Sequence, residues 1–140
     1  MKSIGIIYWS GTGNTKDIAE LIHKGLQEKG HEPQLLNVSE ATLAQVEGMD
    51  LLILGSPSMG CEVIEESEME PFVDSIKNIV AGRSLALFGS YDWGTGEWMD
   101  NWEARMEGYG ANLLGKGLIV NGAPSGTEAE RCIEFGRSLA

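Results

Sequence analysis

Cysteine is scarce in this sequence, and long hydrophobic runs are missing. Its 140 residues include two cysteines, Cys61 and Cys132, and neither belongs to a CxxC or mixed His/Cys pattern. An iron–sulfur centre or a structural zinc is therefore not expected, and free thiols suit a reducing compartment. Residues 51–54 form one of the longest apolar runs, far short of the roughly 20 residues that cross a bilayer. No signal-peptide h-region is visible, so we expect a cytoplasmic protein.

Basic residues are also few. The chain carries 10 Lys and Arg residues against 21 Asp and Glu residues, which gives a formal net charge of -11. Nucleic acid and anionic membranes repel such a surface, so neither is expected as a partner. The length and the 42% hydrophobic content are those of an ordinary globular protein, and we expect one domain over residues 1–140.

Apolar runs and helical spacings alternate along the chain. Short runs predict strands at residues 4–8, 34–38, 51–55, 85–88 and 118–120. Helical spacing predicts helices over 18–26, 42–46, 69–80 and 98–106, and a last one from a capping box at 127–130 to 139. Five alternating pairs predict an α/β fold with a parallel sheet covered on both faces. Ligands of such sheets bind beyond the carboxyl ends of the strands, here at loops 9–15, 56–70 and 89–97.

The first of these loops, "SGTGNT" at residues 10–15, is rich in glycine and hydroxyl groups. The loop does not match the dinucleotide fingerprint G-x-G-x-x-G, because Lys16 stands where the third glycine should be. The Walker phosphate-binding motif, G-x-x-x-x-G-K-S/T, is absent. Gly11 and Gly13 let backbone N–H groups point inward, where the helix N-terminus adds a partial positive charge. This neutral cup fits one terminal phosphate; the alternative is a hydroxyl-rich turn with an N-cap. Side-chain donors would come from Ser10, Thr12, Asn14 and Thr15.

The segment "YWSGTGNT" resembles the phosphate loop of the flavodoxins, specifically the short-chain clostridial type. The similarity also covers "MGCEV", "EESEMEPF", "ALFGSYDWGTGEWM" and "CIEFG", so it runs through essentially the whole chain. The resemblance implies a flavodoxin-like sheet of order 2-1-3-4-5 and one noncovalently bound FMN. It further implies a monomeric, low-potential one-electron carrier that uses the neutral semiquinone and hydroquinone. Its partners would be redox proteins with basic docking surfaces, a reductase donor and an acceptor enzyme.

The resemblance also implies which residues contact FMN. The first loop would hold the phosphate with Ser90 nearby, and Met59 and Trp93 would sandwich the flavin ring. Trp93 lies in a glycine-bounded loop, where a large apolar ring would be exposed to water unless it packed on another apolar surface such as the flavin. The alternative is ordinary packing of Trp93 against a neighbouring loop. Trp98 and Trp102, at helical spacing, are expected in the core or its rim. The expected FMN contacts are Ser10, Gly11, Thr12, Gly13, Asn14, Thr15, Ser58, Met59, Gly60, Cys61, Glu62, Ser90, Tyr91, Asp92, Trp93 and Gly94.

The turn at residues 59–62 is expected to respond to reduction. In the resembling proteins the Gly60–Cys61 peptide flips, so that the Gly60 carbonyl accepts a hydrogen bond from flavin N5–H; one such bond is worth about 1 kcal/mol, or roughly 40 mV. Glu62 would accept from flavin N3–H. Cys61 departs from the commoner Asp, Gly or Asn and is uncomfortable at φ > 0. We therefore expect a less stabilised semiquinone than Gly would give, unless Cys61 is merely a tolerated small residue.

Acidic residues follow this turn. Individually they are expected on a solvated face. Collectively, each carboxylate about 10 Å from the flavin would oppose electron uptake by roughly 20 mV and would help to steer basic partners. The residues are Glu65, Glu66, Glu68, Glu70 and Asp74.

Two other functions remain open from the residues alone. A small FMN-dependent quinone or azo reductase would need a substrate pocket over the flavin, and both a capping Trp93 and the short chain oppose it. A phosphoacceptor receiver would need acidic residues and a lysine at the strand ends, which here offer hydroxyls and glycines. His23 and His31 have no paired nucleophile or acid in the loops. We assign no catalytic residue, no metal ligand and no substrate.

Overall fold

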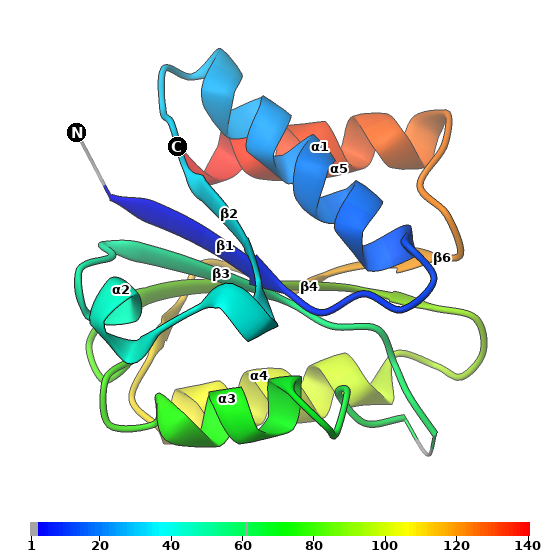
Figure 1. Ribbon diagram of the computed structural model, residues 1–140. Helices are drawn as coiled ribbons and strands as arrows, with labels where there is room; N and C mark the ends of the chain where they lie inside the picture. The colour runs from blue at the N-terminus through cyan, green and yellow to red at the C-terminus, as the bar shows by residue number, and fades with distance from the viewer. Residues whose placement is uncertain (1–2, 61) are drawn as a thin grey trace.

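The computed structural model describes residues 3–60 and 62–140, so the predictions that concern Cys61 lie outside the described residues. It has three layers, with a sheet between two layers of helices (Figure 1). The strands are β1 Ile4–Tyr8, β2 Gln34–Asn37, β3 Leu51–Gly55, β4 Ser84–Tyr91, β5 Asn112–Leu113 and β6 Leu118–Asn121. The helices are α1 Asn14–Glu28, α2 Leu43–Glu47, α3 Met69–Ser75, α4 Glu97–Gly108 and α5 Thr127–Leu139, with a 3-10 turn η1 at Val38–Glu40.

The sheet is parallel throughout its described pairings and has the order β2-β1-β3-β4-β5, as predicted. Its last position differs from the expected single strand. β5 pairs with the beginning of β4, and β6 pairs with the end of β4 from Phe88 to Tyr91. Gly115, with φ +81°, lies between β5 and β6 and departs from extended geometry. The fifth position is therefore filled by two short segments.

The core lies on both faces of the sheet. All five residues of β1 and all five of β3 are buried, which explains their continuous apolar runs. Because side chains alternate along a strand, Ile6 contacts the cluster under α1 and α5, and Ile7 contacts the cluster over α3 and α4 (Figure 1). Among the described residues, no helix is long and apolar enough to span a bilayer.

Two helix predictions were wrong in detail. α3 ends at Ser75, and the chain continues in turns such as the bond from Ile79 N–H to Ile76 O (2.8 Å). Ile76 and Val80 are nevertheless fully buried, so their spacing reports burial and not a longer helix. The capping box at Thr127 does not form, because Gly126 is the N-cap of α5 and Thr127 is already its first helical residue.

Candidate functional site

A cavity of about 130 Å³ opens at the carboxyl ends of β1, β3 and β4. This is the edge of the sheet at which a ligand was expected. Nine of the residues predicted to contact FMN line it; Trp9 and Pro57 line it too and were not predicted. The lining residues are Trp9, Gly11, Thr12, Asn14, Thr15, Pro57, Ser58, Met59, Ser90, Tyr91 and Asp92.

Ser10 shapes the first loop from within. Its hydroxyl oxygen accepts hydrogen bonds from the N–H groups of Gly13 (3.1 Å) and Lys16 (3.3 Å). Gly13 is the N-cap of α1 with φ +104°, a conformation that favours glycine. Ser10 and Gly13 are therefore turn-forming residues beside the cavity and do not line it.

The first turn of α1 supplies donors. Its first backbone bond to the loop runs from Asp17 N–H to Gly13 O (2.9 Å). Within residues 3–60 and 62–140, no group accepts from the N–H groups of Asn14 and Thr15. Free N–H groups at the positive end of a helix suit an anion. Because no cation lines this cavity in the described chain, the donor set is neutral and fits a phosphate monoester such as that of FMN.

A buried pair of hydroxyls joins the first loop to the third. Thr15 Oγ1 and Ser90 Oγ lie 2.8 Å apart, and both residues are buried. Thr15 comes from α1 and Ser90 from β4. Ser90 therefore lies beside the first loop, and its expected place near the phosphate stays a prediction.

The second loop is a small hairpin. Met59 and Val63 exchange two backbone hydrogen bonds of 2.8 and 3.0 Å. Gly60 and Glu62, inside the hairpin, have φ values of +50° and +53°. The positive φ of Glu62 is unusual for a residue with a side chain and indicates a conformation imposed by its surroundings.

The Glu62 carboxylate ties the second loop to the third. Its Oε1 accepts from the N–H groups of Thr95 (2.8 Å) and Gly96 (3.1 Å), just before α4. Gly94 leaves room for this contact, because a Cβ there would overlap Glu62 Oε1 in its present position. Glu62 thus lies at the junction of both loops, although it does not line the cavity described above.

Gly94→Ala should therefore separate these two loops. We expect a loss of about 2 kcal/mol of unfolding free energy, part from the φ of +95° and part from the overlap with Glu62. Urea unfolding of the apoprotein measures it. Gly122→Ala is the matched control, since Gly122 has φ +70° and no described atom near its missing Cβ. Equal losses in the two variants would show that the contact with Glu62 contributes nothing.

The aromatic residues differ in exposure. Trp98 and Trp102 are buried in the core below the sheet, as predicted, while Trp93, which follows the cavity-lining Asp92, is 59% exposed. Trp9, whose role the sequence left open, donates its indole N–H to Glu68 (3.0 Å). Its ring also lies close to Gly11, where a Cβ would come within 2.9 Å of it. Trp9 therefore connects the first loop to the acidic segment of the second.

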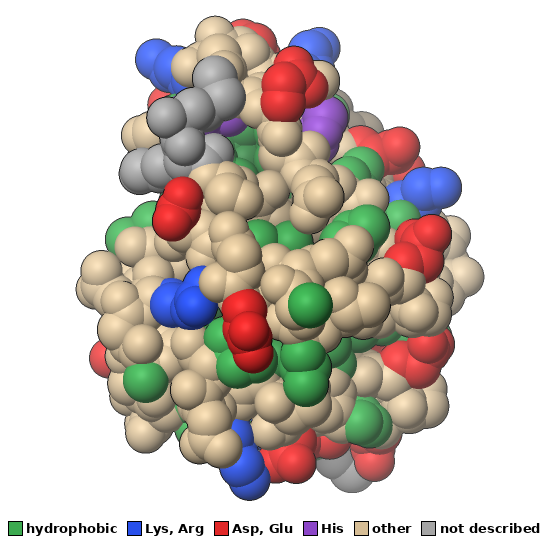
Figure 2. Space-filling view, turned by 60° about the vertical axis from the view of Figure 1, so that its left-hand side comes forward, with side chains coloured by type: hydrophobic (Ala, Val, Ile, Leu, Met, Phe, Trp, Pro, Cys, Tyr) green, Lys and Arg blue, Asp and Glu red, His purple; other side chains and the backbone are tan. Residues whose placement is uncertain are grey.

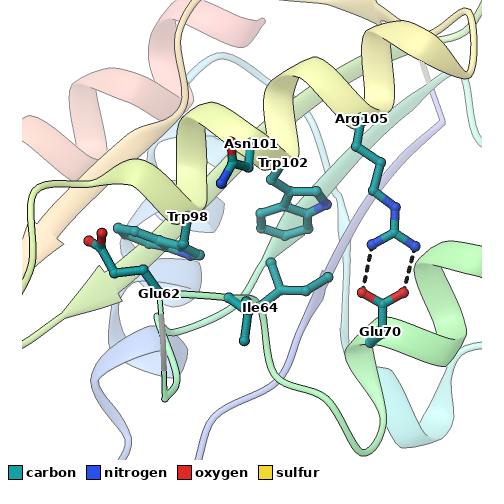
Figure 3. A pocket seen from close by; sticks show the side chains of 8 residues that line it. Glu62, Ile64, Glu70, Trp98, Asn101, Trp102 and Arg105 are labelled. Carbon is teal, nitrogen blue, oxygen red and sulfur yellow. Dashed lines mark hydrogen bonds and ion pairs between the residues drawn. The ribbon is translucent and has the colours of Figure 1, made fainter.

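The acidic segment is not uniformly solvated, which corrects one prediction. Glu65 is buried, because backbone N–H groups of the next turn surround its carboxylate. Glu70 is half-buried and forms a two-pronged ion pair with Arg105 of α4, with both N–O distances 2.6 Å (Figure 3). This pair raises the pKa of Arg105 further above its ordinary range. Glu66, Glu68 and Asp74 are exposed as predicted.

Figure 3 shows a second cavity, of about 120 Å³, between α3 and α4. Trp98 and Trp102 form one wall, Ile64 another, and the Glu70–Arg105 pair lies at one end. Of the predicted site residues that the structure describes, Glu62 alone lines it. It therefore lies behind the second loop and is separate from the cavity at the strand ends.

Comparisons with known proteins agree with this geometry. A family model described as flavodoxin matches residues 6–136. A flavodoxin of Clostridium beijerinckii is 49% identical over 135 residues, which are 96% of this chain and 97% of that protein. A flavodoxin of Megasphaera elsdenii is 39% identical over 137 residues, 98% of each chain. The solution structure of the two-electron reduced Megasphaera elsdenii flavodoxin superimposes with a TM-score of 0.90 at 38% identity and 96% coverage of both chains.

Proposed function

Since the chain belongs to the flavodoxin family, whose members bind FMN and carry electrons, we propose that it passes single electrons between redox proteins and has no substrate of its own. The observation that supports this most is the cavity at the strand ends, where neutral donors of the first loop meet two further loops that carry Met59 and exposed Trp93. When bound, FMN supplies the ability to accept and release one electron at a time. The residues of the chain hold it in place.

We assign the phosphate end of FMN to the first loop. The free N–H groups of Asn14 and Thr15 and the side chains of Thr12 and Asn14 would bind its oxygens. Ser10 would act mainly by shaping the turn. The Thr15 and Ser90 hydroxyls, already bonded to each other, would close the inner wall.

We assign the flavin ring of FMN to the second and third loops. Met59, 37% exposed, and Trp93, 59% exposed, are two of the few large apolar side chains left in solvent. Covering them with a flat aromatic ring removes apolar surface from water and permits stacking on the indole. The Glu62 carboxylate, held by the amides of Thr95 and Gly96, is the acceptor we assign to the ring's N3–H.

Basic redox proteins are the proposed partners. Exposed carboxylates of Glu66, Glu68, Asp92 and Glu97 lie in or next to the second and third loops. These exposed carboxylates form an acidic rim around the proposed FMN site. Figure 2 shows a face of the molecule away from this rim, on which Lys and Arg side chains lie among acidic ones. Such a face of mixed charge attracts a basic partner less than the acidic rim does. Docking at the rim would bring a partner close to the proposed ring site.

We also propose that the protein acts as a monomer in the cytoplasm.

One anaerobic titration tests the proposal. The purified protein should bind FMN in a one-to-one complex, and stepwise reduction should accumulate one-electron-reduced flavin, visible by its absorption spectrum, before full reduction. NAD(P)H-dependent quinone turnover should stay near the rate of free FMN. Fast turnover with NAD(P)H would favour the reductase alternative, and failure to bind added FMN would refute both.

A further inference from the structure

Glu65 is a buried carboxylate with a complete set of hydrogen bonds. It is 4% exposed. Its Oε1 accepts from the N–H groups of Glu68 (2.7 Å) and Met69 (2.9 Å), and its Oε2 accepts from Ser67 N–H (2.7 Å) and the Ser67 hydroxyl. Burial by itself would raise the pKa of Glu65, but these hydrogen bonds outweigh burial and lower it. The residue is therefore charged at neutral pH.

The backbone of Glu65 makes a second set of contacts. Its N–H donates to the hydroxyl of Ser56 (2.9 Å), which follows β3, and its carbonyl accepts from Glu70 N–H in α3 (2.9 Å). The Ser56 hydroxyl in turn donates to the carbonyl of Pro57 (2.9 Å). Glu65 therefore joins the beginning of the second loop to the beginning of α3.

Two of the three loops assigned to FMN, the first and the second, connect to this network. The hairpin of Met59 and Val63 lies between Ser56 and Glu65, so its two ends are held at one point. Glu68, whose N–H binds the Glu65 carboxylate, accepts the indole N–H of Trp9 beside the first loop. Glu65 itself does not line the cavity at the strand ends.

We propose that Glu65 is a positioning residue, which holds the second loop and the Trp9 contact in the shape that receives FMN. A site that is ordered before binding loses less conformational freedom when the ligand arrives and so binds more tightly. The proposal rests on FMN binding, the proposed function, and adds a residue that acts through the loops and not by touching the cofactor.

Glu65→Gln tests it, with Glu66→Gln as the matched control. Both remove one negative charge at adjacent positions, but Glu66 is exposed. Glutamine at position 65 keeps one acceptor oxygen and turns an NH₂ group toward donors. We expect the dissociation constant for FMN to rise about tenfold or more in Glu65→Gln, and to change by less than about twofold in Glu66→Gln.

Amide hydrogen exchange of the apoprotein gives a readout without FMN. In Glu65→Gln the amides of Met59 and Val63 should exchange about tenfold faster, and in Glu66→Gln they should not change. Faster exchange confined to Glu68 and Met69, with FMN affinity equal to that of Glu66→Gln, would mean that Glu65 only caps α3. If the unaltered protein failed to bind FMN, the proposed function would fail; if it bound FMN and Glu65→Gln bound equally well, only the positioning role would fail.

Ser56→Ala covers the case in which Glu65→Gln does not fold. It removes the acceptor for Glu65 N–H and leaves the carboxylate network in place. The FMN dissociation constant should rise by about threefold or more, with faster exchange at Met59 and Val63. Unchanged affinity and unchanged exchange in this variant would overturn the proposal.

Discussion

Gly136→Ala should cost about 3 kcal/mol or more of the free energy of unfolding, a large share of a protein's total stability. A Cβ at Gly136 of α5 would overlap the backbone carbonyl oxygen of Ile22 in α1. At the same crossing, a Cβ at Gly25 would overlap the carbonyl oxygen of Ile133. Since neither collision involves the end of a flexible side chain, the helices must move apart (Figure 1). Their shared core with the sheet would then lose its close packing.

The measurement is urea unfolding of the apoprotein, followed by circular dichroism. Gly108→Ala is the control, because Gly108 ends α4 and no described atom lies within 4 Å of its missing Cβ. That variant should gain up to about 1 kcal/mol from helix propensity. A Gly136→Ala variant as stable as Gly108→Ala would show that α1 and α5 do not pack this closely in solution.

This crossing was not predictable from the sequence, whereas the central strands were. β1 and β3 have the predicted bounds because both are buried on both faces and so carry unbroken apolar runs. The place where two helices cross depends instead on the orientation of α1 and α5 over the sheet. Periodicity identifies the buried face of each helix but not the residue of each that meets the other.

In the candidate site, too, some features could be predicted from the sequence and others could not. The meeting of the three loops at one cavity could be predicted, because parallel strands bring their carboxyl ends to one edge, whatever the side chains. The burial of Glu65 was missed because its partners are backbone N–H groups of the following turn, which no residue type reveals. A run of acidic residues in a sequence is also typical of a solvent-exposed face. Ser10 was predicted as a phosphate ligand because its hydroxyl is a donor; that the same oxygen accepts from Gly13 and Lys16 depends on the path of the turn.

Asn14→Asp should weaken FMN binding by about 100-fold while leaving the apoprotein as stable as before or slightly more stable. The substitution keeps the side chain's shape and adds a carboxylate at the first residue of α1, where it lines the cavity. A unit charge about 5 Å from a phosphate charge is repelled by about 3 kcal/mol at an effective dielectric constant of 20, which corresponds to that loss of affinity. The same carboxylate favours the fold, because it lies at the positive end of the helix, by about 0.3–1 kcal/mol.

Riboflavin, which lacks the phosphate, separates this cause from general damage to the site. Its affinity should change by less than about threefold in Asn14→Asp, because the ring contacts are assigned to other loops. Asn112→Asp adds the same charge at the exposed first residue of β5 and should leave FMN affinity within about twofold of normal. Isothermal titration of the apoproteins measures the FMN constant of the unaltered protein and both variants, and the riboflavin constant of the unaltered protein and Asn14→Asp. Equal losses for FMN and riboflavin would place the phosphate elsewhere, and equal losses in both variants would mean that overall charge, and not the neutral cup of the first loop, governs binding.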